Sequence, residues 1–207
     1  VDIAGLARGA SEGHGLGNQF LAHIREVDAV MHVVRCFSNE NVVHVDGAVN
    51  PARDIEAIET ELIMADLASA ESALGKARAQ AKRNDKDAAR RVEVLEPCVE
   101  TLGNGRPVRE VPLHDLEGRK QLRSFSLLTA KPMLYVANVD DADLKGVSPA
   151  AQSVVEYAEN HGGRAAFVCA ELEAEMLQLS VEERCEMLDA LELQESALET
   201  VARAAYD

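Results

Sequence analysis

Three short apolar runs along the chain indicate buried strands. Residues 29–34, 133–138 and 165–170 are mostly apolar, and the first run is rich in β-branched side chains. A strand that is buried on both faces of a parallel sheet has this continuous apolar character, whereas a half-exposed strand alternates apolar with polar residues. We therefore expect these three segments to lie in a buried parallel sheet.

Helical patterns separate the predicted strands. Apolar residues recur at helical spacing over roughly residues 18–27, 148–160 and 182–191. Ser180 followed by Glu183 is a capping-box pattern, in which side chains and backbone exchange hydrogen bonds, and it marks the start of the last helix. Strands that alternate with helices predict an α/β fold.

A different pattern interrupts this alternation between residues 54 and 120. Apolar side chains there follow one another at alternating steps of three and four, which is the spacing of a coiled-coil seam. One line of such positions is Ile55, Ile58, Leu62 and Ala65; a neighbouring line is Ile63, Leu67, Ala70, Leu74 and Ala77; the last line, beyond the polar turn at Asn84 and Asp85, is Ala88, Val92, Leu95, Val99 and Leu102. Two such helices joined by a polar turn predict an antiparallel helical hairpin.

The second helix of the hairpin contains residues that are expected to interrupt it and to end it. Pro97 lies inside it, and because proline lacks a backbone donor we expect a kink or a local break there. Gly103, Asn104 and Gly105 predict its end. The hairpin stands between two predicted strands, so it is interpreted as an insertion. The predicted domains are residues 1–53 and 121–207, which build the sheet, and residues 54–120, which build the inserted hairpin.

Charge and composition limit the kinds of partner that the chain is expected to bind. The 207 residues carry a formal net charge of −15, and only 3% are aromatic. Such a chain is soluble and is not a general polyanion binder, so DNA is not an expected partner. No run has the length and apolarity of a membrane span, and no secretion signal opens the chain.

The cysteines indicate the cellular compartment, and the first residues indicate that the chain is part of a longer one. Cys36, Cys98, Cys169 and Cys185 form no C-x-x-C pair, which fits reduced, buried thiols of a cytoplasmic protein rather than a zinc site or a disulfide framework. There is no initiator Met, and Val1 begins what reads as the end of a buried strand. We therefore expect a fragment.

Three polar motifs follow the predicted strands. Asp2-Ile3-Ala4-Gly5 has the D-x-x-G form of a switch II segment, in which Asp2 would hold Mg²⁺ through water and the Gly5 amide would bond the γ-phosphate. Taken alone, this motif is weak and fits a strand followed by an ordinary turn better. Asn138-Val139-Asp140-Asp141 stands where nucleotidases read the base, and Cys169-Ala170-Glu171 stands where they carry a second base-pocket loop. Ligands bind at the carboxyl ends of strands in open α/β sheets, so the three motifs together favour a nucleotide site.

Dense local matches resemble the Obg-like ATPase (YchF) family over essentially the whole chain. They lie within residues 1–45, 50–56, 60–62, 126–132 and 202–206, and include Gly13-His14-Gly15-Leu16-Gly17-Asn18 and Asn50-Pro51-Ala52-Arg53-Asp54-Ile55-Glu56. The resemblance implies a P-loop nucleotidase domain of the translation-factor class with an inserted helical coiled coil. It also implies Mg²⁺-dependent hydrolysis of ATP or GTP and association with ribosomes. Whether K⁺ is also required is left open.

The resemblance also implies missing parts. No G-x-x-x-x-G-K-[ST] phosphate-binding loop occurs in the chain, and the TGS domain that ends members of the family would follow Asp207. Without that loop the groups that hold the β- and γ-phosphates are absent. We therefore expect this chain alone to bind nucleotide poorly, to hydrolyse it negligibly and to expose an edge strand.

Three positions bear on the chemistry. Asp141 stands where the family usually has Glu, and a shorter carboxylate is what GTPases use to pair with guanine, so the preference between ATP and GTP is open. Val139 replaces the Lys of ordinary GTPases and argues against that class. Leu6 stands where Ras-like GTPases place a water-orienting Gln. The resemblance points to His44 as the replacement, because a neutral imidazole can orient or deprotonate water near pH 7. The alternative is a surface histidine without a catalytic role.

Positive charge gathers around the predicted hairpin turn of this acidic chain. The basic residues there are Lys76, Arg78, Lys82, Arg83, Lys86, Arg90 and Arg91. Ribosomal RNA is a plausible partner through phosphate contacts, and a solvated helix end is an equal alternative. Three functions therefore stay open: a Mg²⁺-dependent ATPase, a ribosome- or partner-binding module with negligible catalysis, and an ordinary Obg-type GTPase.

Overall fold

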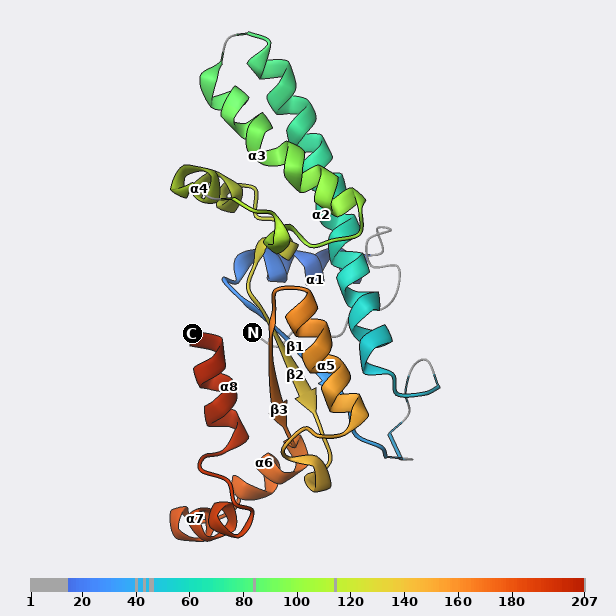
Figure 1. Cartoon of the computed structure of the whole chain (residues 1–207), viewed down its shortest axis with the longest axis vertical. Coiled ribbons are helices and arrows are strands. Elements are labelled where there is room, and N and C mark those ends of the chain that lie inside the picture. The colour runs from blue at the N-terminus through green and yellow to red at the C-terminus, as the bar shows by residue number, and fades with distance from the viewer. Residues whose placement is uncertain are drawn as a thin grey trace. The chain divides into compact units, whose positions relative to one another are not determined.

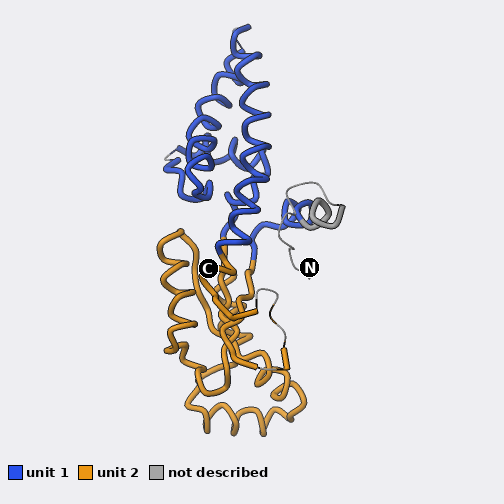
Figure 2. The backbone as a smooth tube through the Cα atoms, turned by 90° about the vertical axis from the view of Figure 1, so that its right-hand side faces the viewer, with its two compact units in different colours: residues 1–30, 56–132 blue, residues 31–55, 133–207 orange. Residues whose placement is uncertain are grey.

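The computed structural model describes residues 15–206 except residues 40, 43, 45, 46, 84 and 114, and its strands and helices are labelled in Figure 1. The chain divides into two compact units, each built from two segments (Figure 2). Unit 1 comprises residues 1–30 and 56–132, and unit 2 comprises residues 31–55 and 133–207. The domain limits predicted from the sequence at residues 53 and 120 stay a prediction.

Three strands form a parallel sheet, in the order β1 (Val30–Arg35), β2 (Met133–Asn138) and β3 (Arg164–Val168). β2 and β3 pair in parallel, with Asn138 opposite Val168. The Cys36 N–H donates to the Asn138 carbonyl at 2.8 Å, and the Val30 N–H donates to the Pro132 carbonyl at 3.0 Å, so β1 runs in the same direction as β2. All three strands therefore end at the same edge of the sheet.

Helices cover both faces of the central strand. The ring of Tyr135 meets that of Tyr157 on α5 (Pro149–Asn160), with the ring centroids 5.6 Å apart. Val136 points to the other face, where it packs in a cluster with Val201 of α8 (Ala197–Tyr206). Successive side chains of a strand alternate between faces, so the two helices lie on opposite sides. This double burial explains why the sequence of β2 is continuously apolar.

The first strand differs from its neighbour. Met31 and Val33 are exposed at 46% and 59%. The prediction that this run is buried on both faces is therefore wrong for these two side chains. The physical reason is the position of α8, which packs on β3 and β2.

Short helices complete unit 2. They are the 3-10 helix η4 (Asp141–Asp143), α6 (Ala170–Met176) and α7 (Val181–Ala190). The predicted third strand stops two residues early, because Ala170 already belongs to α6. The predicted capping box at the start of α7 is confirmed: the Ser180 hydroxyl accepts from the Glu183 N–H, and the Glu183 carboxylate accepts from the Ser180 N–H.

Two long helices, α2 (Pro51–Ala81) and α3 (Lys86–Gly103), form the predicted hairpin (Figure 1). Its buried seam follows the apolar spacing of the sequence. The buried members are Ile63, Ala70, Leu74, Ala77, Leu95, Cys98 and Leu102, joined by Val108 and Leu127 from the following segments. The carboxylate of Asp85 in the turn accepts from the Ala88 N–H at 3.0 Å and so caps α3.

Proline does not end the second helix. α3 continues through Pro97 to Gly103, so the local break that Pro97 predicted does not occur. Leu95 and Cys98, on either side of the proline, are both anchored in the hairpin seam and hold the helix together there. The predicted end is confirmed, since Gly105 adopts a φ of +72°, which glycine enters without strain.

A buried carboxylate fixes the hairpin to the segment that leads into β2. Asp66 of α2 is fully buried and accepts hydrogen bonds from the Leu128 N–H at 2.8 Å and from the Thr129 N–H and hydroxyl at 2.7 Å each. Leu128 and Thr129 belong to the 3-10 helix η3 (Leu128–Ala130). The Thr129 oxygen in turn accepts from the N–H of Val108, which begins η2 (Val108–Glu110). Unit 1 also contains α1 (Gly15–Glu26) and α4 (Leu116–Ser124).

Candidate nucleotide site and basic hairpin turn

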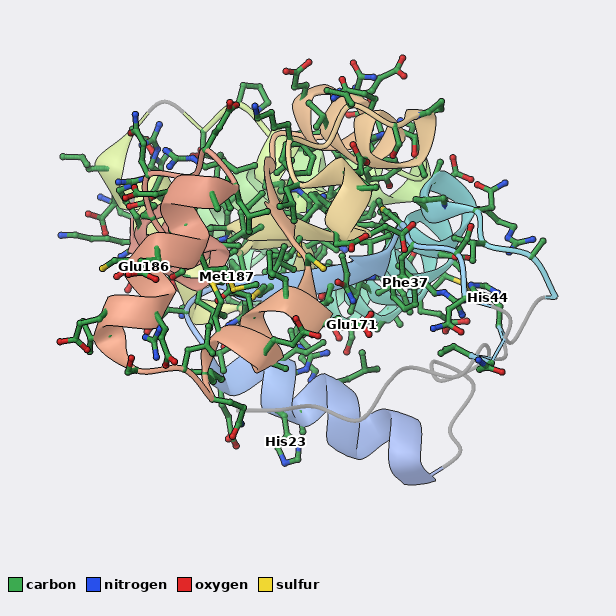
Figure 3. The ribbon with its side chains drawn as sticks, turned by 90° about the horizontal axis from the view of Figure 1, so that it is seen from below. His23, Phe37, His44, Glu171, Glu186 and Met187 are labelled. Atoms are coloured by element: carbon green, nitrogen blue, oxygen red, sulfur yellow. The ribbon has the colours of Figure 1, made fainter. Side chains whose placement is uncertain are left out.

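The carboxyl edge of the sheet gathers polar groups from three loops. Figure 3 views this side of the molecule, and Phe37, His44 and Glu171 are labelled on it. The loops follow β1, β2 and β3 directly, because the strands run in parallel. All the residues of this edge described below lie in unit 2.

Asn138 joins the second and third loops. Its side-chain oxygen accepts a hydrogen bond from the backbone N–H of Ala170 at 3.1 Å. The pairing of Asn138 with Val168 across the sheet brings these groups within reach. The two motifs predicted to read a base are therefore neighbours, linked by a direct contact.

The other predicted base-site residues differ in accessibility. The side chains of Asp141, Ala170 and Glu171 are exposed at this edge. Val139 and Cys169 are only 2% and 4% exposed, so their side chains belong to the core. The Val139 N–H is occupied by the Val168 carbonyl at 2.8 Å. Among the predicted base-site residues, Asp141 and Glu171 are thus the acidic side chains that a ligand at this edge could contact.

Two further aspartates shape the loop after β2. One oxygen of Asp140 accepts from the Ser38 N–H at 3.3 Å, which ties this loop to the loop after β1. The Asp143 carboxylate accepts from the Val147 N–H at 2.7 Å and the Ser148 N–H at 3.1 Å. Sequence reasoning did not assign either role. Asp143 could have been found, because aspartate commonly accepts from nearby backbone N–H groups in turns.

A glycine allows the loop after β2 to lie against β3. Gly146 has a φ of +64°, and a Cβ atom there would be 2.3 Å from the Phe167 ring. Any larger residue would strain the backbone and displace the ring. Gly146 therefore helps to hold the loop that carries Asp141.

Arg35 organises the loop that follows β1. Its guanidinium group donates to the carbonyls of Phe37 at 3.2 Å, Asn39 at 3.1 Å and Val42 at 2.9 Å. The same group lies 4.6 Å from the centroid of the Phe37 ring, a cation–π contact. Sequence reasoning missed this arginine, since no periodic pattern marks a side chain that binds carbonyls of its own loop.

His44 meets a carboxylate at the start of α2. Its Nε2 atom lies 2.9 Å from Oδ2 of Asp54, and the two side chains are 17% and 22% exposed. The other oxygen of Asp54 accepts from Arg53 Nη2 at 3.2 Å, and the same Nη2 donates to the Ala48 carbonyl at 2.7 Å. The partner of His44 was not among the predicted site residues, because the two residues are ten positions apart and no motif links them.

The predicted switch residues Asp2 and Gly5 lie outside the described residues. Within the part that the structure describes, no three or more His, Cys, Asp or Glu side chains come together as a metal site. The assignment of Asp2 as the residue that holds Mg²⁺ therefore stays a prediction. No helix among the described residues is long and apolar enough to cross a membrane.

The basic residues predicted to bind a partner lie at the end of the hairpin. Lys82, Arg83 and Lys86 surround the turn and are exposed, and Lys76 is exposed on α2. The remaining three arginines meet other side chains: Arg78 pairs with Glu96 at 2.9 Å, Arg90 pairs with Glu93 and Asp115, and Arg91 donates to Gln80. Asp85 and Asp87 lie near the turn in the sequence, and the fold adds Glu93, Glu96 and Asp115 as partners of these arginines. The net positive surface is therefore centred on Lys82, Arg83 and Lys86.

The cysteines fall into two groups. Cys36, Cys98 and Cys169 are buried, as predicted, and Cys185 is exposed, so the prediction of four buried thiols is wrong for Cys185. Burial, reinforced by the charges of Asp143 and Asp54, raises the pKa of Cys36 to about 12. Burial likewise raises the pKa of Cys98 to about 11. Both groups are therefore thiols at neutral pH.

Comparison with known proteins matches the whole chain to part of longer relatives. The chain is 47% identical over 206 residues to "Ribosome-binding ATPase YchF" from Escherichia coli O157:H7, and 43% identical over 209 residues to the protein of that name from Bacillus subtilis (strain 168). Both alignments cover 100% of this chain but 56% and 57% of the relative, so the chain spans about half the length of these relatives. No family model matches the chain.

A solved structure shares the fold. The Schizosaccharomyces pombe YchF GTPase matches with a TM-score of 0.81 and 30% sequence identity, over 99% of this chain and 56% of that one. The parallel sheet with its helices is therefore the architecture of an Obg-like P-loop nucleotidase.

Proposed function

Because the chain belongs to the Obg-like ATPase (YchF) family, we propose that its sheet edge binds the base of a nucleoside triphosphate and takes part in hydrolysing that nucleotide. The observation that carries the proposal is the 3.1 Å hydrogen bond from the Ala170 N–H to the Asn138 side chain. It brings together, at the carboxyl ends of adjacent strands, the two loops where α/β nucleotide-binding proteins hold their ligand.

The groups at this edge suit a purine. The Asn138 side chain has an amide NH₂ that can donate to a ring nitrogen while its oxygen is engaged by Ala170. Asp141 and Glu171 are exposed acceptors for exocyclic amino groups. ATP is the expected nucleotide and GTP the alternative.

Asp2 would hold Mg²⁺, which would supply positive charge to offset that of the triphosphate. The other proposed roles, orienting the base and activating the water, would belong to residues of this chain. Asn138 and its neighbours would orient the base, and His44 would orient the attacking water and accept its proton. No G-x-x-x-x-G-K-[ST] segment occurs in this sequence, and the chain spans about half the length of its relatives, so turnover is proposed for the full-length gene product.

Equilibrium binding tests the base site. Fluorescent ATP and GTP analogues would be titrated with Mg²⁺ into the full-length gene product and into the chain alone. We expect Asn138→Ala to weaken binding to the full-length product about tenfold or more, because a base donor and the link to Ala170 are both lost. Asn160→Ala, which truncates an exposed asparagine at the far end of α5, is the matched control. Unchanged affinity in the Asn138 variant would overturn the assignment of the base site.

A second proposed function belongs to the hairpin turn. Three exposed cations, Lys82, Arg83 and Lys86, stand together in a chain of net charge −15. Such a local reversal of charge suits the phosphates of ribosomal RNA. The turn has no aromatic side chain on which bases could stack, so phosphate contacts would dominate. A ribosome partner would place the protein in the cytoplasm.

A further inference from the structure

His44 and Asp54 form a half-buried pair at the edge where hydrolysis is proposed. The distance from Nε2 to Oδ2 is 2.9 Å. We propose that Asp54 is a positioning residue for His44: it fixes the orientation and the tautomer of the imidazole that activates water. The inference rests on the proposed function, since it gives His44 the role of base.

The chemistry of the pair defines the tautomer. An ionised carboxylate can only accept hydrogen bonds, so a neutral His44 facing Asp54 must carry its proton on Nε2. In that tautomer the basic lone pair lies on Nδ1. Asp54 thereby selects the nitrogen that receives the proton of water.

The step that follows is balanced. The water oxygen forms a bond to the γ-phosphorus, and the bond from that phosphorus to the β–γ bridging oxygen breaks. The bonding electrons leave with the nucleoside diphosphate. The proton of the water passes to Nδ1 of His44 and from there to the released phosphate. Asp54 stabilises the imidazolium that forms, as the carboxylate does in serine hydrolases.

Asp54 is itself held in place. Arg53 donates from Nη2 to Oδ1 of Asp54 at 3.2 Å, leaving Oδ2 directed at His44. The Asp54 N–H donates to the Asn50 carbonyl at 3.0 Å, so the carboxylate rises from the first turn of α2. The Asn50 side chain caps the Arg53 N–H at 3.2 Å. A carboxylate on a capped helix positions a partner more exactly than one on a loop.

A double-mutant cycle separates positioning from general support of the fold. ATP hydrolysis by the full-length gene product would be measured for His44→Ala, Asp54→Ala, Asp54→Asn and the double variant His44→Ala/Asp54→Ala. Glu56→Gln, an exposed carboxylate on the same helical turn, is the matched control. Thermal unfolding midpoints report whether each variant is folded.

We expect His44→Ala to lower kcat about 100-fold and Asp54→Ala to lower it about tenfold or more, with KM changed less than about twofold. In the His44→Ala background, Asp54→Ala should have no further effect, because a positioning residue acts only through its partner. Asp54→Asn keeps an acceptor without the charge and should fall between wild type and Asp54→Ala.

Other outcomes separate the two hypotheses. An unchanged kcat in His44→Ala would overturn the role of His44 and, with it, the inference. A reduced kcat in His44→Ala beside an unchanged one in Asp54→Ala would overturn the positioning role alone. An equal loss from Asp54→Ala in both backgrounds would show that Asp54 acts through the fold instead.

Discussion

Asn138 connects two loops that lie 32 residues apart in the sequence. The N–H of Ala170 is engaged by this contact and so is not offered to the oxygen at position 6 of guanine, whereas adenine carries an amino donor at that position. Asp141 would act in the opposite sense, because its carboxylate suits the N–H groups at N1 and N2 of guanine. In the proposed site, the preference between ATP and GTP would therefore depend on the balance between these two effects.

Replacing Asp141 tests this balance. We expect Asp141→Asn to lower the affinity for GTP about tenfold, because a charged acceptor for two guanine donors is lost, and to change the affinity for ATP less than about threefold. Competition between the nucleotides for a fluorescent analogue on the full-length gene product measures both. Asp189→Asn, an exposed aspartate on α7, serves as control. Equal losses for both nucleotides would mean that Asp141 does not read the base.

Thiol chemistry gives a second test at single positions. Cys36 and Cys98 have pKa values raised to about 12 and about 11 by burial, and the thiolate is the form that reacts. Cys185 is exposed. We expect iodoacetamide at neutral pH to label the native protein at Cys185 alone, and all four cysteines after denaturation. Mass spectrometry of wild type and Cys185→Ser gives the count, and rapid labelling of Cys36 would contradict the structure around it.

At the scale of helices, the contact between Asp66 and η3 leads to a prediction about the free energy of unfolding. Asp66→Ala leaves two buried N–H groups and the Thr129 hydroxyl without their acceptor. We expect the free energy of unfolding to fall by about 1–3 kcal/mol at neutral pH, measured by urea denaturation. Asp85→Ala, which removes the exposed cap of α3, should cost about 1 kcal/mol or less and is the control.

The same carboxyl group makes stability depend on pH. Burial raises the pKa of Asp66, and the hydrogen bonds from Thr129 and Leu128 only partly offset this effect. Between its unfolded pKa of about 3.9 and the raised folded value, the folded protein binds more protons than the unfolded one. The stability of wild type relative to Asp66→Ala should therefore be largest below about pH 4 and decline as the pH rises through that window. A relative stability that grows with pH would refute this sign.

What could be read from the sequence was local. The hairpin seam and the Ser180 cap depend on residues within one or two helical turns of each other, and both were predicted. The pairing of His44 with Asp54 and the three carbonyls bound by Arg35 depend on irregular loops, which periodicity does not describe. The helices α4, α6 and α8 have seven to ten residues and were missed, because such short helices owe their stability to tertiary packing.

Taken whole, the protein places its two proposed functions in different units: the nucleotide edge in unit 2 and the basic turn in unit 1. The variant Lys82→Glu/Arg83→Glu/Lys86→Glu should weaken cosedimentation with ribosomes about tenfold or more at low salt. It should also make the dependence of log K on log salt shallower by about two to three. Lys120→Glu/Arg123→Glu/Arg164→Glu makes the same change in net charge elsewhere. An equal effect from both triple variants would refute a specific role for the turn, and nucleotide binding should be unaltered in each.

The division into two interleaved units has a consequence for how the molecule is made. The loop after β1 is completed by a contact between Ser38 and Asp140, which are 102 residues apart. At about 5–20 residues per second of protein synthesis, β1 would emerge about 5–20 s before the strand beside it. The hairpin, whose contacts are local, can fold in this interval and shorten the loop that the sheet must then close. The pairing of β1 with β2 is non-local and therefore slow. The hairpin inserted between these strands folds quickly and shortens the segment that this pairing must close.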